Sequence, residues 1–428
     1  MTHPTSTAVS PAPAESEADP QDRLPKLWHV MVMAVLAVAF TAAFMSVYGA
    51  LSQLIWANEY VLANRWTIVV GVILFSLLVG LTQKYLRAPT VIHGGFTETM
   101  KGGGGETDYR TFPGALLSSF ASLLSGASVG PEGPVTILVQ DISAWVRTRL
   151  RVTPKAALGF DVAALASALN GVVGNPLFTG VFATEYAVGA SSGLTYLVWN
   201  LLAGVIGFAF YSLLGLNAFA SFLAFEPVTH LEPAYWVWAI VLGVVGAVVA
   251  IYTAASMQLF GRLVPRLFGE RVVLRALGAG VVISIVGVFL PQLLFSGEDQ
   301  IHAIVANPAQ YGVAVLLLLA VLKPLLLGLA FKSGFLGGPT FPILFTCTMV
   351  GLALQLLFPS VPMSILVLCI EGPAIALALS APLTAILLVS VIGTSDPETI
   401  ALLVLSTVVG LLVGGAIKRA IAGRAVPA

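Results

Sequence analysis

The chain has 428 residues, of which 58% are hydrophobic and 9% charged, and its formal net charge is zero. A water-facing surface needs about a quarter charged residues, so this composition excludes an ordinary soluble protein. The balanced charge gives no reason to expect nucleic acid as a partner. We therefore expect a polytopic, all-α membrane protein, in which Cys347 and Cys369 are buried free thiols rather than a disulfide or a metal site.

The two ends of the chain predict its orientation. Residues 1–24 are rich in Pro, Ala, Ser and acids, which predicts a disordered tail, and no cleavable signal peptide is visible. Basic residues precede the first apolar segment and follow the last one, at Arg23, Lys26, Lys418, Arg419 and Arg424. Because cytoplasmic flanks carry excess Lys and Arg, we expect both termini in the cytoplasm and the protein in the inner (plasma) membrane. From the short C-terminal tail we expect no C-terminal regulatory domain.

Apolar segments along the chain fall into two length classes. Bilayer-spanning helices need roughly 20 apolar residues, and seven runs are long enough, near residues 30–51, 66–82, 194–215, 234–255, 273–294, 311–331 and 397–415. Between residues 112 and 186, and again between 338 and 393, Gly, Pro and Asn cut the chain into pieces of roughly 10 to 18 residues. Such pieces fit half-spanning helices whose ends meet inside the protein.

An internal repeat connects these two broken regions. The stretches SGASVGPEGP at 125–134 and SGFLGGPTFP at 333–342 share the frame S-G-x-x-x-G-P-x-x-P. A second pair of landmarks follows each copy, NPLFTG at 175–180 and APLTAI at 381–386. We interpret this as duplication, with a first membrane half at 25–215 and a second at 216–424. Duplicated membrane folds are typical of transporters whose site lies between the halves.

The repeated frame has a readable chemistry. Gly-Pro before an apolar run predicts a helix start, with Gly as the N-cap and Pro at the first helical position. Free N–H groups and the positive end of the helix dipole form an anion site there. Lys and Arg are nearly absent from these segments, which favours weak, reversible binding. The predicted anion-binding residues are Gly130, Pro131, Gly133, Gly338, Pro339, Thr340 and Phe341.

Glu132 is the one carboxylate in the repeated frame. It lies in the first turn of the first predicted helix, where the dipole that attracts an anion also favours a carboxylate. An ionisable residue at membrane depth is a functional-site hypothesis by default. Since the charged side chain would compete with the anion and protonation would remove the competitor, we expect Glu132 to couple proton uptake to anion movement.

These motifs resemble those of the CLC chloride channels and proton/chloride antiporters. GPEGP at 130–134 is similar to the family's G-[KR]-E-G-P, GPTFP at 338–342 loosely to G-x-F-x-P, NPLFTG to N-A-P-L-A-G, and SAPLTAIL at 380–387 to R-A-P-L-T-G-I-L. Order and spacing agree over roughly residues 28–420. The resemblance implies two inverted-repeat halves, a homodimer with one ion pathway per subunit, and a gating role for Glu132.

The chain also departs from that family's pattern. The family's G-S-G-I-P motif should lie where this chain has TVIHGGF, so Thr90 and His93 are the candidates to replace its serine as an anion contact. For His93 a hydrogen-bonded residue at a helix start is the alternative. Pro131 and Pro339 each remove one N–H donor, and no tyrosine follows Tyr311 to supply the family's last ion contact. Where antiporters of the family carry two inner acids, this chain has Glu185 followed by tyrosine. The resemblance implies a proton-delivery role for Glu185; a helix-end charge is the alternative.

Several functions stay open at this point. Proton-coupled exchange of chloride leads; the alternatives are a passive anion channel gated by Glu132 and a transporter selective for fluoride or nitrate. We expect no enzyme activity, no cofactor and no metal, because no hydrolase motif or metal-ligand spacing is present. Glu371, in the sequence IEGP, repeats Glu-Gly-Pro outside the repeat frame and is interpreted as a buried or interfacial acid with a local partner.

Overall fold

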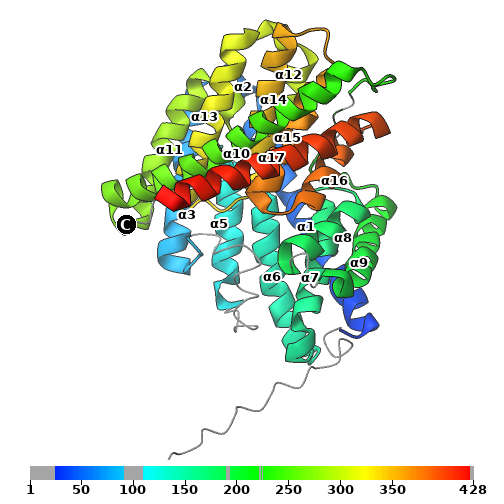
Figure 1. Ribbon diagram of the computed structural model, residues 1–428. Helices are drawn as coiled ribbons and strands as arrows, with labels where there is room; N and C mark the ends of the chain where they lie inside the picture. Colours follow the sequence, from blue (N-terminus) through cyan, green and yellow to red (C-terminus); the bar gives the residue numbers. More distant parts are fainter. Residues whose placement is uncertain (1–24, 91–108, 189–192, 221–222, 224, 425–428) are drawn as a thin grey trace, which may run out of the picture.

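The computed structural model describes residues 25–90, 109–188, 193–220, 223 and 225–424, and all regular structure within these ranges is helical. The tail expected at residues 1–24 lies outside them. The helices form one all-α assembly (Figure 1).

The first half of the chain builds eight of the labelled α-helices. They are α1 (Leu27–Trp56), α2 (Glu59–Ala63), α3 (Trp66–Leu86), α5 (Phe112–Leu124), α6 (Glu132–Arg149), α7 (Ala157–Ala168), α8 (Pro176–Val188) and α9 (Gly193–Leu213). Three short 3₁₀ turns connect them, η2 (Tyr109–Thr111), η3 (Pro154–Ala156) and η4 (Leu169–Gly171).

The second half again contains eight labelled α-helices. They are α10 (Pro233–Phe268), α11 (Val272–Phe289), α12 (Glu298–Ala306), α13 (Gly312–Lys332), α14 (Thr340–Leu357), α15 (Met363–Leu379), α16 (Pro382–Ile392) and α17 (Pro397–Arg424). Two 3₁₀ turns, η5 (Pro291–Leu293) and η6 (Pro308–Gln310), flank α12. Proline opens α10, α16 and α17, where its missing N–H costs no hydrogen bond.

Helix length confirms the expected membrane spans. Among the described residues, 8 helices are long and apolar enough to cross a bilayer, and seven of them match the runs expected from the sequence. The eighth, α14, departs from the expectation that the region 338–393 holds only half-spanning pieces, because its 18 residues are long and apolar enough to cross; it begins at a contact with the first half. The helices α5, α15 and α16 are shorter apolar helices, as the interrupted composition of these regions predicted.

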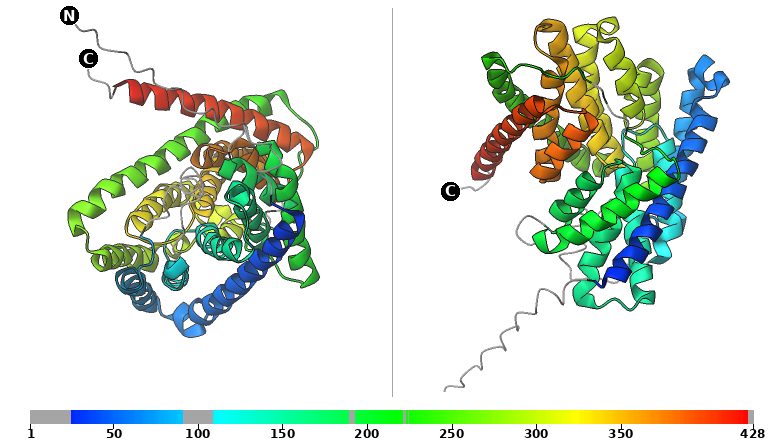
Figure 2. Two further views of the ribbon diagram at one scale, coloured as in Figure 1. Left: turned by 90° about the horizontal axis from the view of Figure 1, so that it is seen from below. Right: turned by 90° about the vertical axis from the view of Figure 1, so that its right-hand side faces the viewer.

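The two copies of the repeat point in opposite directions. Helix α6 runs downward and α14 upward from a common meeting point in the middle of the molecule (Figure 1), and the side view in Figure 2 shows the same separation. The helix pairs that begin at the repeat landmarks, α6 with α14 and α8 with α16, therefore start near the boundary between the halves. This is the arrangement expected of half-spanning helices whose ends meet inside the protein.

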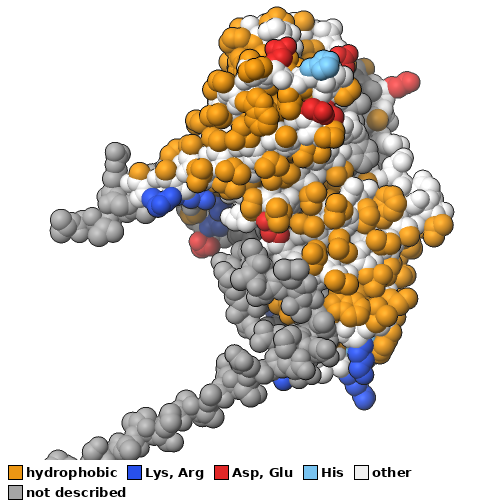
Figure 3. Space-filling view, turned by 45° about the vertical axis from the view of Figure 1, so that its right-hand side comes forward, with side chains coloured by type: hydrophobic (Ala, Val, Ile, Leu, Met, Phe, Trp, Pro, Cys, Tyr) orange, Lys and Arg blue, Asp and Glu red, His pale blue; other side chains and the backbone are white. Residues whose placement is uncertain are grey.

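The outer surface is apolar, as a bilayer-facing surface must be. Exposed Leu, Val, Ile and Trp side chains follow α1, α3, α10 and α11. Figure 3 shows hydrophobic side chains over most of one face, a histidine and several acids at the upper end, and Lys and Arg at mid-height on the left, with acids beside them, and at the lower end. The charged groups thus gather where water or lipid headgroups would meet the protein.

A lysine side chain lies in the core. Lys323 of α13 is 0% exposed, and its Nζ donates to the carbonyl oxygens of Leu293 (3.1 Å), Leu294 (3.4 Å) and Phe295 (2.7 Å). The main-chain N–H of Phe295 in turn donates to the Gly126 carbonyl, 3.0 Å away, in the first repeat copy. The buried amino group therefore fixes a turn of the second half against the segment that leads to Glu132.

Candidate functional site

The two repeat copies contact each other directly. The Gly130 N–H donates to the Gly338 carbonyl at 2.9 Å, and the Gly338 N–H donates to the Gly130 carbonyl at 2.8 Å. Both copies also share a left-handed glycine, Gly126 with φ 76° and Gly334 with φ 97°. Only glycine adopts such angles without strain, which explains why Ser-Gly opens both frames.

Each helix starts one residue later than expected. Pro131 and Pro339 are the N-cap residues rather than the first helical residues, and the helices begin at Glu132 and Thr340. Gly130 and Gly338, which were predicted as the N-caps, instead exchange the two main-chain hydrogen bonds that join the copies. The prolines still supply no N–H, so the loss of one donor at each helix start remains as predicted.

Glu132 reaches across to the other helix start. Its Oε1 accepts a hydrogen bond of 2.8 Å from the Thr340 N–H, the first residue of α14 and its counterpart 208 residues later. Its Oε2 is buried and has no hydrogen-bond partner among the described residues. A Cβ at Gly130 or Gly338 would collide with this carboxyl group, so the paired glycines also make room for it. The carboxylate of Glu132 thus lies where the dipole of α14 attracts an anion.

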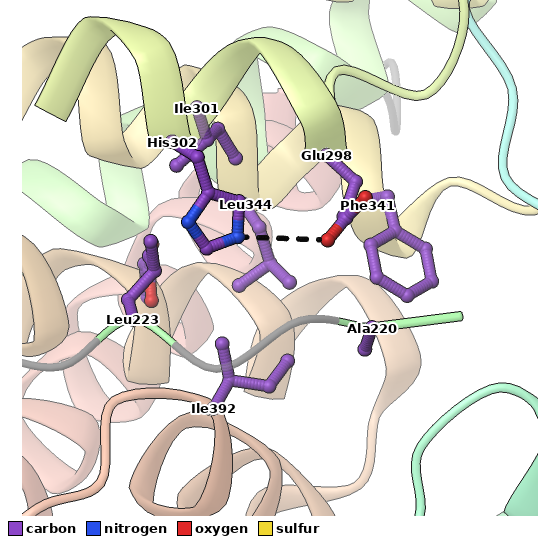
Figure 4. Close-up of a pocket in the computed structure, with 9 residues that line it drawn as sticks. Ala220, Leu223, Glu298, Ile301, His302, Phe341, Leu344 and Ile392 are labelled. Carbon is purple, nitrogen blue, oxygen red and sulfur yellow. Dashed lines mark ion pairs between the residues drawn. The ribbon is translucent and has the colours of Figure 1, made fainter. Parts of the chain in front are cut away.

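Phe341 closes one side of this position. Its buried ring packs edge-on against Phe219, with ring centroids 5.1 Å apart. In Figure 4 the ring lies beside Glu298 of α12 at the edge of a hollow. Phe219 and Glu298 also line a second hollow, of about 380 Å³, together with Tyr48 and Asp299. The aromatic pair thus separates this hollow, at the α12 end of the molecule, from the start of α14.

Two polar side chains support the second repeat copy. Ser122 of α5 accepts a hydrogen bond of 2.9 Å from the Leu336 N–H, and the Gln83 side-chain amide donates to the Gly334 carbonyl at 2.6 Å. Sequence reasoning missed both residues. Gln83 is the one amide side chain in the apolar run of α3, and a buried polar group of this kind usually has a partner, but its partner lies 251 positions away.

Glu185 caps a helix of the other half. Its two carboxylate oxygens accept from the Leu383 N–H (3.1 Å) and the Thr384 N–H (2.7 Å) at the start of α16. In the first repeat copy the corresponding amide, that of Phe178, is bonded to the side chain of Asn175 at 2.9 Å. The second copy has Ala381 at that N-cap, which cannot accept, and Glu185 of α8 supplies the missing acceptor.

We expect Glu185→Gln to destabilise the protein by about 1 kcal/mol, because the start of α16 loses a charged acceptor. Thermal unfolding in detergent measures the change. Asn175→Ala is the matched variant, since it removes the acceptor from the corresponding amide of α8, and a loss of similar size is expected. A melting temperature unchanged by Glu185→Gln would show that these two hydrogen bonds contribute nothing to the fold.

A cavity reaches the candidate site from the side of the C-terminal helix. It has a volume of about 620 Å³ and lies among α10, α14, α15 and α17. Its lining includes Pro339 at the start of α14, Ser380 at the end of α15 and the exposed Lys418 near the end of α17. The cavity therefore joins a basic surface to the residue that precedes Thr340.

The first-half residues expected to contact the anion before α5 are placed only in part. Thr90 is half-buried and is the last described residue after α3. His93 lies outside the described residues. Both stay predictions.

Comparison with known proteins decides the family. A family model described as voltage gated chloride channel matches residues 75–415. The chain belongs to the voltage-gated chloride channel family. Curated relatives include the candidate ion-transport protein YfeO of Escherichia coli O7:K1 (strain IAI39) and of Escherichia fergusonii, each 29% identical over 265 residues. The match covers 60% of this chain and only 61% of the length of these relatives.

Solved structures of the family share the fold. A slow cyanobacterial Cl⁻/H⁺ antiporter has a TM-score of 0.77 at 20% identity, covering 91% of this chain and 94% of that one. A CLC-type fluoride/proton antiporter has a TM-score of 0.75 at 19% identity, with coverages of 91% and 95%. A eukaryotic CLC transporter has a TM-score of 0.68 at 17% identity, with coverages of 91% and 71%. The all-α, CLC-type fold expected from the motifs is confirmed, and the long apolar helices agree with a multi-span membrane protein.

Proposed function

We propose that this chain exchanges a small anion, chloride in the first place, for protons, with Glu132 as the gating and coupling carboxylate. The observation that carries the proposal is the hydrogen bond from the Thr340 N–H to Glu132 Oε1, 2.8 Å long, at the start of α14. A carboxylate held by main-chain N–H at a helix start occupies the place that such a site offers to an anion. Anion and carboxylate then compete for one position.

Only some of the predicted residues can donate a hydrogen bond to the anion. The amides of Gly130 and Gly338 donate to each other, and Pro131 and Pro339 have no N–H. These four residues shape the site, and the donors are the main-chain N–H groups at the beginning of the two helices, those of Gly133, Thr340 and Phe341. Thr90 and His93 are kept as contacts from the preceding segment. Neutral donors bind weakly enough for the ion to leave again.

Protonation sets the direction of coupling. When Glu132 takes up a proton, its carboxyl group becomes neutral and is no longer attracted by the dipole of α14. The anion then takes the place of the carboxylate at the Thr340 N–H. Loss of the proton restores the competitor and expels the anion. Glu185, whose carboxylate lies at the start of α16, is proposed to deliver protons from the cytoplasmic side.

The cavity lined by Pro339 and Lys418 is proposed as the cytoplasmic entry for the anion. Both termini then lie in the cytoplasm, and the protein resides in the inner (plasma) membrane. Two such chains form a homodimer with one pathway each, and each chain divides into halves at 25–215 and 216–424. The concentration of basic side chains toward that end supports this orientation (Figure 3).

We expect Lys418→Ala to lower anion flux several-fold at low ionic strength, because the lysine raises the local anion concentration at the cavity mouth. At about 1 M salt, where the Debye length is about 3 Å, the difference should disappear. The measurement is chloride efflux from liposomes at two salt concentrations. Arg419→Ala is the control, since Arg419 is the next residue but does not line the cavity. Equal effects of the two variants would contradict a specific role for Lys418.

A passive channel is the second candidate, favoured by Tyr186 at the place of the second inner acid of antiporters in this family. The reversal potential in liposomes with opposing proton and chloride gradients separates the two. An exchanger reverses at a voltage set by both gradients, whereas a channel reverses at the chloride equilibrium potential alone. Replacing chloride by fluoride or nitrate in the same assay identifies the preferred anion.

A further inference from the structure

A second buried carboxylate lies in α15. Glu371 is 1% exposed, and its Oε1 accepts a hydrogen bond of 2.9 Å from the hydroxyl of Thr348 on α14. Its Oε2 is buried and has no hydrogen-bond partner among the described residues. A buried carboxylate oxygen without a donor is costly when charged, and the cost falls when the group carries a proton.

Glu371 lines a small hollow together with an acid and a histidine of α12. These are Glu298 and His302, whose Oε1 and Nε2 are 3.6 Å apart. Figure 4 shows this pair above Phe341, Leu344 and Ile392. The His302 side chain is 39% exposed. The hollow, of about 20 Å³, therefore lies between a partly exposed histidine and the buried acid, and the rest of its lining is apolar.

The groups that surround Glu371 leave it without a charge partner. From α14 the facing groups are Thr348 and the thiol of Cys347, and from α12 they are Glu298 and His302. The next residue, Gly372, packs on Leu403 and Thr407 of α17, and α10 approaches with Gly246 beside the Ile370 carbonyl. Helix α16 has no ionisable residue. In the part of the chain that the structure describes, no Lys or Arg forms an ion pair with Glu371.

We propose that Glu371 and Thr348 form a second proton-binding site, separate from Glu132 and loaded from the α12 end through this hollow. A proton from water, passed on by the His302 imidazolium, forms an O–H bond at Oε2, while the Thr348 hydroxyl keeps its bond to Oε1. Phe341 lines the same hollow and follows Thr340, which holds Glu132. The binding of a proton here is independent of the proposed exchange.

Infrared difference spectroscopy after a pH jump tests this site without any transport. The wild-type protein should show a carbonyl stretching band of a buried carboxyl group that disappears in Glu371→Gln and persists in Glu132→Gln. Thr348→Val keeps the acid but removes its hydroxyl donor, so the band should shift in frequency rather than vanish. A spectrum in which Glu371→Gln keeps every carboxyl band of the wild type would overturn the proposal.

The route is tested with the same band. His302→Gln leaves Glu371 in place, so the band should reach its full amplitude but appear several-fold more slowly after acid is added at the α12 side of reconstituted, oriented protein. Tyr311→Phe serves as a control at the same end of the molecule, outside the hollow. An unchanged rate in His302→Gln would show that the proton reaches Glu371 by another path, and the hollow would lose its assigned role.

Discussion

Replacing Glu132 with glutamine is expected to keep anion transport while abolishing its pH dependence and its coupling to protons. Glutamine has the shape of the protonated acid but never the charge that competes for the Thr340 N–H. In the wild-type protein, flux should rise as pH falls, because acid neutralises the competitor. In the variant, flux should be independent of pH and proton uptake should be lost completely. Chloride efflux and proton uptake from the same liposomes measure both.

Glu398→Gln is the matched control for this variant. Glu398 also follows a proline and also lies in the first turn of a helix, α17, but away from the paired glycines. If Glu132 were only a favourable first-turn acid, both variants would cost about 0.3 to 1 kcal/mol of stability and leave coupling intact. Proton pumping that survives in Glu132→Gln would show that another group couples the two fluxes.

Replacing Lys323 with methionine is expected to cause the largest loss of stability. Methionine keeps most of the packing but leaves the carbonyls of Leu293, Leu294 and Phe295 without their shared donor. An unsatisfied buried acceptor costs about 1 to 3 kcal/mol, so a loss of at least about 2 kcal/mol is expected after the amine's own burial cost is removed. Thermal unfolding of purified protein in detergent measures this.

Lys332→Met provides the comparison, since Lys332 is on the same helix but only half-buried at its end. Its melting temperature should stay close to that of the wild type. Lys323→Met should in addition slow anion transport in the fraction that remains folded, because the turn it fixes holds Gly126 of the first repeat copy. Equal melting temperatures for the two variants would mean that the buried amino group does not stabilise the turn.

Local chemistry explains which parts of the fold were predictable. The long apolar runs and the Gly-Pro frames are local signals, and they predicted the spans, the helix starts and the pairing of the copies. The shift by one residue at Pro131 and Pro339 was not predictable, because it follows from the bridge between Gly130 and Gly338. That bridge joins segments 208 positions apart in the chain.

The residues of the candidate site were predictable from the sequence only in part. Glu132 is visible from its position in the frame, but its partner Thr340 is visible only in three dimensions. The cap that Glu185 supplies to α16 is implied by the difference between Asn175 and Ala381, once the two landmarks are known to be equivalent. Lys323 gave no usable signal, since an amine in an apolar run does not reveal which carbonyls surround it.

The measurement that tests the central claim most directly is the number of protons taken up when chloride binds. Calorimetric titration in buffers of different ionisation enthalpy gives this number for the purified protein, with millimolar binding, about −4 kcal/mol, expected for main-chain donors. If chloride and the Glu132 carboxylate compete for the Thr340 N–H, wild-type protein takes up close to one proton per chloride at a pH where the carboxylate is charged, and Glu132→Gln takes up none. Chloride binding without proton uptake in the wild type at every pH would contradict it.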